Sequence, residues 1–148
     1  MDASGPAVED HGRAVSTGSR AATWYRQAQR AIDHRQALTA LRLAVEADPA
    51  FELALADLHA ITGTSGQPQG RGQMNWERHH IEVVRTAASG NGKRAADLLR
   101  EHLAAVGCDP LAVRIVARMR QQAGMNGGLE DLVARLPDCH PTRWPSPP

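Results

Sequence analysis

The chain has 148 residues, with 17 Lys and Arg against 16 Asp and Glu, so its formal net charge is only +1. This balance argues against a strongly basic nucleic-acid binder and against a polybasic membrane sensor. Aromatic residues make up 3% of the chain, and a composition rich in Ala, Leu and Arg favours helix over sheet. No apolar run approaches the roughly 20 residues of a membrane span. We therefore expect one all-α domain in the cytoplasm, with no nucleic-acid and no membrane partner.

The two ends of the chain lack any helical periodicity. Residues 1–19 are rich in Gly, Ser, Ala and charge, which predicts a disordered N-terminal segment. Residues 137–148 hold five prolines and cannot form a helix interior. The start carries no basic segment followed by an apolar one, so no secretory signal is predicted. The folded domain is expected between these ends, over residues 20–136.

Between the ends, apolar residues recur every three or four positions, which predicts amphipathic helices. The first is expected to bury Trp24 and Ala28, and the third Leu55 and Leu58. Residues 63–73 contain four glycines and no large apolar side chain, so they are predicted to form a loop. About seven antiparallel helices are expected, over residues 20–32, 36–47, 49–61, 75–89, 93–106, 110–123 and 129–136.

The same spacing of residues ahead of an Asp-Pro pair occurs twice, and every one of these positions except Leu98 holds a small residue. Ala37, Ala44 and Pro49 share their offsets with Leu98, Ala105 and Pro110. At each site an Asp can cap the next helix while the Pro fills its first turn, where no amide donor is needed. In a tetratricopeptide repeat, small residues let two helices approach closely and the proline starts the next hairpin. The two phrases are therefore expected to open equivalent layers of a right-handed array, with a middle hairpin truncated at the glycine loop.

The chain resembles tetratricopeptide-repeat proteins, and most closely the tetratricopeptide repeat protein 38 family. The resemblance is carried by AVEADPAFELALADLHA at 44–60, by WERHHIEVVRTAASGN at 76–91 and by LLREHLAAVGCDPLAVRIVARM at 98–119. One departure is Tyr25, which stands where the first helix of a repeat usually has glycine. The resemblance implies a scaffold with a concave binding groove and no catalytic residues.

Residues 80–103, HIEVVRTAASGNGKRAADLLREHL, also resemble the end of the FCD domain, the helical effector-binding module of GntR-type repressors. This second resemblance implies a metal-binding histidine at each end of the phrase, at His80 and His102. It also implies an upstream Asp and His four residues apart. Asp57 and His59 are only two residues apart, and such positions lie on different faces of a helix.

Five residues are candidates for a partner-binding groove. Trp24, Arg26, Gln29 and Arg30 form a dense patch that would grip an acidic segment or a C-terminal carboxylate through arginine, and His80 is the fifth. The competing interpretation places Trp24 in the core and leaves the arginines as a solvated face.

The histidines and cysteines give weaker signals. A metal site needs three or more convergent ligands, and only His80 and His102 are expected to meet across a hairpin, so surface histidines are the competing interpretation. Cys108 and Cys139 do not form a recognisable disulfide framework. Cys108 at a helix start would be reactive only with a base nearby.

The sequence therefore predicts a non-catalytic scaffold without a cofactor, which binds a protein or peptide segment of acidic character or associates as a homodimer. The alternative is a small helical domain that binds a ligand or a metal, with catalysis left open.

Overall fold

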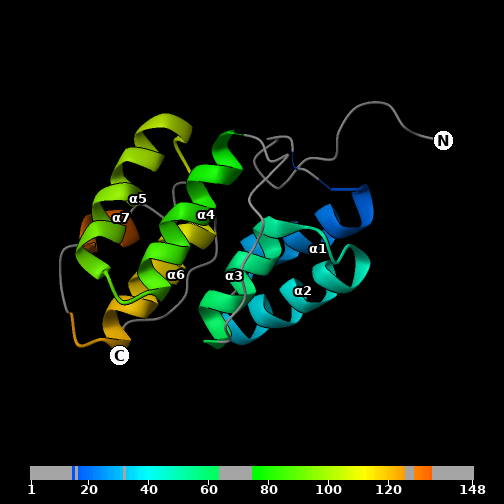
Figure 1. Cartoon of the computed structure of the whole chain (residues 1–148), viewed down its shortest axis with the longest axis horizontal. Helices are drawn as coiled ribbons and strands as arrows, with labels where there is room; N and C mark the ends of the chain where they lie inside the picture. The colour runs from blue at the N-terminus through cyan, green and yellow to red at the C-terminus, as the bar shows by residue number, and fades with distance from the viewer. Residues whose placement is uncertain (1–14, 16, 32, 64–74, 126–128, 135–148) are drawn as a thin grey trace.

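The computed structural model describes residues 15, 17–31, 33–63, 75–125 and 129–134. These residues contain seven helices and no strand (Figure 1), so the all-α prediction is confirmed. None of these helices has the length and apolar character that a bilayer-crossing segment requires. The helices are α1 (Ser19–Arg30), α2 (His34–Ala47), α3 (Glu52–Thr62), α4 (Asn75–Ala88), α5 (Gly92–Val106), α6 (Pro110–Gln122) and α7 (Glu130–Ala134).

Neighbouring helices pack in pairs along the chain. α1 pairs with α2, and α4 pairs with α5, while α3 packs against both α2 and α4. α1 to α3 lie on one side of the molecule and α4 to α7 on the other (Figure 1). α6 contacts α1, α3, α4, α5 and α7. This helix therefore lies where the two sides meet.

The apolar core has two parts that share α4 and α6. The first part is built mainly from α1 to α3 and includes Ile81 of α4 and Ile115 of α6. The second joins Val83 of α4 and Val116 of α6 to Leu99 of α5 and to α7. Because α4 and α6 present apolar side chains to both parts, burial of these two helices ties the halves together.

Two helices bury a face that differs in part from the one predicted. In α1 Ala28 is buried as predicted, but the buried aromatic residue is Tyr25, while Trp24 is half-buried. In α3, Leu53 and Asp57 are buried, whereas Leu55 and Leu58 are half-buried. α3 packs against three helices, and its alanines on the inner side allow close approach, so Leu55 and Leu58 line the edges of the contact.

The first Asp-Pro pair does not begin a helix in the way the sequence suggested. α3 starts at Glu52, its N-cap is Phe51, and no side chain caps it. Asp48 instead ends α2, and its Oδ1 accepts a hydrogen bond from the amide of Ala50 at 3.1 Å. The small residues ahead of the pairs also differ, because Ala44 is buried and Ala105 is exposed. The two phrases therefore pack differently.

Part of the predicted disordered N-terminal segment is packed against the domain. Val15 is buried in the first core part, and the hydroxyl of Thr17 donates to Asp48. The predicted loop 63–73 is described only at Gly63, which ends α3 in the left-handed conformation, with φ of 73°. The predicted tail 137–148 lies outside the described residues. Cys108 is disulfide-bonded, so the expectation of cysteines without a disulfide was wrong for this residue.

Candidate metal centre

The site is built around Asp109, the residue immediately before α6. Asp109 is the N-cap of this helix, and its Oδ1 accepts from the amide of Ala112 at 3.3 Å, while Pro110 occupies the first turn. This is the cap-then-proline device predicted from the sequence. The carboxylate is only 1% exposed, so its second oxygen, Oδ2, points into the protein interior.

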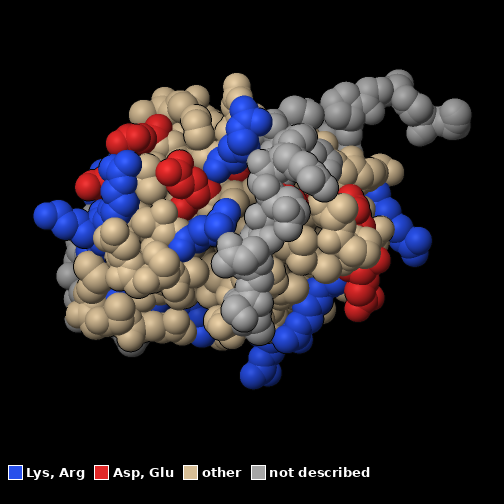
Figure 2. All heavy atoms as spheres, in the orientation of Figure 1, with Lys and Arg blue, Asp and Glu red and all other residues tan. Residues whose placement is uncertain are grey.

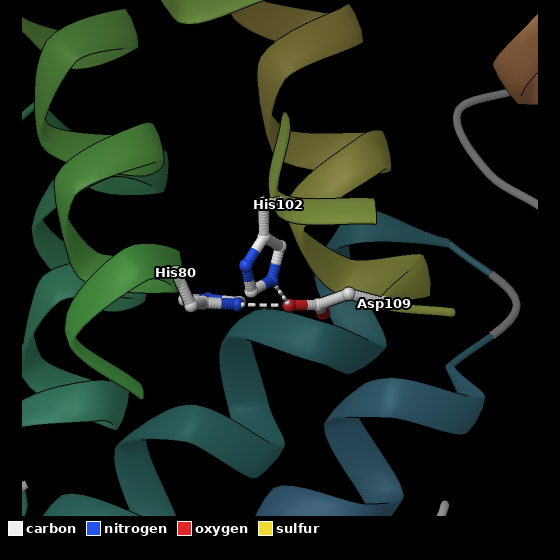
Figure 3. A group of neighbouring side chains, drawn as sticks. All are labelled: His80, His102 and Asp109. Atoms are coloured by element: carbon white, nitrogen blue, oxygen red, sulfur yellow. Dashed lines mark hydrogen bonds and ion pairs between the residues drawn. The ribbon is translucent and has the colours of Figure 1, made fainter. Parts of the chain in front are cut away.

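Two histidines meet at that second oxygen. His80 Nδ1, from α4, lies 2.6 Å from Asp109 Oδ2, and His102 Nε2, from α5, lies 2.7 Å from the same atom. Figure 3 shows the two rings approaching Asp109 from different helices, with their planes strongly inclined to each other. His80 is 0% exposed and His102 is 2% exposed. Side chains from α4 and α5 thus meet at the carboxylate that caps α6.

A second carboxylate holds the far side of His80. Asp57 of α3 is fully buried, and its Oδ1 lies 2.6 Å from His80 Nε2. Its other oxygen, Oδ2, accepts from the phenol of Tyr25 at 2.7 Å. His80 is therefore bound on both ring nitrogens, and the polar chain runs from Tyr25 through Asp57, His80 and Asp109 to His102.

Next to these polar residues, side chains of α1 and α6 supply hydrogen-bond partners to each other's helix ends. The Gln29 carboxamide oxygen accepts from the amide of Leu111 at 3.0 Å, and its nitrogen donates to Asp109 Oδ1 at 3.4 Å. In the opposite direction, Arg114 Nη1 donates to the carbonyl oxygens of Gln29 at 3.0 Å and Ala31 at 3.4 Å. The end of α1 and the start of α6 thereby gain hydrogen-bond partners for backbone groups that have none within a helix. These contacts fix the start of α6, and with it Asp109.

The charges in the cluster shift one another. Burial opposes the charge on His80, but the neighbouring Asp109 and Asp57 outweigh burial and raise the pKa of His80 to about 10. Burial also opposes the charge on Asp109, yet His80 and His102 hold its pKa well below 3.8. For Asp57, burial dominates and raises the pKa. Without a metal, His80 is an imidazolium ion held between carboxyl groups at neutral pH.

Three donor atoms in this cluster are close enough to share one metal ion. One ligand atom each from His80, His102 and Asp109 lies within 4.8 Å of the others. Zinc holds nitrogen ligands at about 2.0–2.1 Å, which spaces tetrahedral donors about 3.3 Å apart. The hydrogen-bonded donors would therefore move apart by about 0.6 Å to admit an ion. His102 Nδ1 is buried and has no hydrogen-bond partner among the described residues. The donor set fits a transition metal.

The predicted groove residues do not lie on one surface. Gln29 and His80 are fully buried and engaged in the contacts above, so neither is accessible to a partner in this conformation. Trp24 is half-buried beside an open hollow between α1 and α2, while Arg26 is half-buried and Arg30 is exposed. Acidic and basic side chains occur on both halves of the face shown in Figure 2, without a single basic patch.

The predicted pairing of His80 with His102 in space is what the structure shows, but sequence reasoning missed the carboxylates. Asp109 was assigned only as a helix cap, and Asp57 was considered only with His59. His59 is half-buried and lies outside the group of convergent donors. One signal was present, because Asp57 falls four residues after Leu53 and three before Ala60, on the alanine-rich face that α3 buries.

Comparisons of this chain with protein-family models, with curated proteins and with solved structures found no match.

Proposed function

We propose that this protein is a metal-binding helical domain, which holds one divalent transition-metal ion between His80 Nδ1, His102 Nε2 and Asp109. The observation that carries the proposal is the convergence of three donors from three helices within 4.8 Å, in a fully enclosed position. Two imidazole nitrogens and one carboxylate oxygen are ligands that zinc commonly takes. Water or another small ligand would complete the coordination.

The charge of the cluster supports a bound cation. In the metal-free protein, a proton on His80 compensates the charge of Asp109. A divalent cation would compensate it instead and would leave the two imidazoles neutral, which is the state in which they bind metals.

The enclosure of the site supports a structural role for the ion. The three donors are at most 2% exposed, so a substrate has no direct access to them. The ion would join α4, α5 and the start of α6, and its binding free energy would add to the stability of the fold.

The test is zinc binding to the metal-stripped full chain, measured by calorimetry and by elemental analysis after dialysis. We expect one equivalent in the wild type and in His59→Ala, because His59 is half-buried on α3 and lies outside the group of convergent donors. His80→Ala and His102→Ala should lose the bound zinc while retaining helical circular dichroism. A wild-type chain that binds no zinc at micromolar concentrations, or a His102→Ala variant that still binds one equivalent, would contradict the proposal.

A second candidate function is the peptide-binding scaffold expected from the sequence. It is favoured by a hollow of about 410 Å³ on the α1–α2 hairpin, to which Trp24 contributes an aromatic side chain and Arg35 a cationic one. An acidic peptide bound there should dissociate more readily as salt rises. Fluorescence titration of Trp24→Ala and Arg35→Gln against the wild type tests this. Light scattering on the same samples would reveal the homodimer that the sequence also left open.

A further inference from the structure

The far side of His80 carries contacts that the proposed metal ligands do not explain. Asp57, Tyr25 and His80 come from α3, α1 and α4, and all three side chains are 0% exposed. Asp57 uses one oxygen for His80 Nε2 at 2.6 Å and the other for the phenol of Tyr25 at 2.7 Å. Each buried polar group in this arm has a defined partner, so the arm has one low-energy arrangement.

The surroundings of the two ring nitrogens of His80 are unequal. Nδ1 faces Asp109, which also receives His102, so two further donors are gathered on that side. Nε2 faces the carboxylate of Asp57 at 2.6 Å and the hydroxyl of Tyr25 at 3.4 Å, and that hydroxyl donates to the second oxygen of Asp57. Among the described residues, three His and carboxylate donors therefore converge on the Nδ1 side, whereas the Nε2 side offers one carboxylate.

Resting on the proposed metal-binding function, we infer that Asp57 and Tyr25 are positioning residues, which bind His80 Nε2–H and so present Nδ1 to the metal. Metal-binding histidines commonly donate their other N–H to a carboxylate, which fixes the tautomer and strengthens the ligand. His102 has no such contact, because its Nδ1 is unpartnered among the described residues. The two histidines are thus unequal ligands, and His80 is the preorganised one.

The test is a Co²⁺ titration of the metal-stripped full chain, followed by the visible absorption of the bound ion. Asp57→Asn should weaken Co²⁺ binding about 10–100-fold with the absorption bands in their wild-type positions, since no ligand is lost. Tyr25→Phe removes only the phenolic oxygen and should give a smaller loss in the same direction. The matched control is Asp131→Asn, which removes an exposed carboxylate paired with Arg100 and should leave Co²⁺ affinity unchanged.

Two outcomes would overturn the inference while leaving the metal site intact. One is wild-type affinity in Asp57→Asn. The other is a change in its absorption bands like that of Asp109→Asn, which would make Asp57 a ligand itself.

Should both variants lose helical circular dichroism, nitrogen-15 spectra of the zinc-loaded wild type decide the question. A proton on Nε2 of His80 supports the inference and a proton on Nδ1 overturns it. Absence of Co²⁺ binding by the wild type would overturn the proposed function, and this inference with it.

Discussion

Asp48-Pro49 and Asp109-Pro110 each separate two helices, yet the first pair lies at the surface and the second near the centre of the molecule. Asp48 is half-buried and Pro49 exposed, whereas Asp109 and Pro110 are both buried. Asp48 closes a turn, and Asp109 caps α6 while receiving two histidines. The same Asp-Pro pattern therefore forms a turn at residue 48 and part of an ionic cluster at residue 109, because different helices pack against the two sites.

The largest expected difference is between two matched substitutions, Asp109→Asn and Asp48→Asn. The Asn at 109 can still accept from Ala112, but it cannot compensate a buried imidazolium, so we expect a loss of about 3–5 kcal/mol. Asp48→Asn should cost less than about 1 kcal/mol, because the Asn side-chain oxygen can still accept from the amide of Ala50 in the turn. Urea denaturation of the metal-free chains measures both. Equal losses would mean that the two Asp-Pro pairs are energetically equivalent after all.

The pH dependence of stability should also separate the two aspartates. His80 has a pKa of about 10 in the folded protein against 6.5 ordinarily. A raised pKa stabilises the fold fully below pH 6.5, and this contribution is lost as the pH rises to about 10. The raised pKa of Asp57 also favours folding at low pH, and this contribution is lost as the pH rises from 3.8 through the pKa of the folded protein. The melting temperature of the metal-free chain should therefore fall from pH 6.5 to 10.

Removing one of the two carboxylates that hold the proton on His80 should weaken this dependence. Thermal melts should show a shallower fall in Asp109→Asn than in the wild type, and an unaltered fall in Asp48→Asn. A melting temperature that stays constant over this pH range in the metal-free wild type would show that His80 is neutral there.

A smaller loss of stability is expected when the contact between α6 and α1 is broken. The surface pair Asp48-Pro49 takes no part in such a contact. Arg114→Met removes donors to two α1 carbonyls and should cost about 1–3 kcal/mol. Arg100→Met breaks the exposed pair with Asp131, whose side chains are 43% and 59% exposed, and should cost less than about 1 kcal/mol. Chemical denaturation of both variants tests the contrast, and a larger loss at Arg100 would reverse it.

The two proline substitutions should differ least in the stability that they cost. Pro49→Ala is expected to cost about 0.4–1 kcal/mol, chiefly by giving the unfolded chain more freedom. Pro110→Ala should cost modestly more, because Pro110 is buried in α6. Thermal unfolding of the two variants measures this. If their difference exceeded that between the aspartate variants, the polar cluster would not be what distinguishes the two sites.

The helices were predictable because their signals are local. Apolar spacing and the Asp109-Pro110 cap placed α6 from residue 110, as observed. The buried face was less predictable, since Trp24 and Tyr25 are both large and aromatic, and only tertiary packing decides which one points inward. In the structure Tyr25 lies edge-on to Phe51 of the next hairpin, with ring centroids 5.6 Å apart.

The site was predictable only in part, because its members come from positions far apart along the chain. His80 and His102 were expected to meet, since they belong to one hairpin. Asp57 is 23 residues from His80, and spacing alone does not bring the two together. Asp109 has an adequate local explanation as a helix cap, and this concealed its second role in the ionic cluster.

The bond from Arg114 to the end of α1 has a consequence for biosynthesis. The carbonyl oxygens of Gln29 and Ala31 receive this guanidinium from 85 and 83 residues further along the chain. While the ribosome is still producing the first hairpin, α1 lacks the group that completes its last turn. Among the described helices, the first to emerge is therefore finished by the sixth, and a nascent chain that stops before α6 lacks this contact in its N-terminal half.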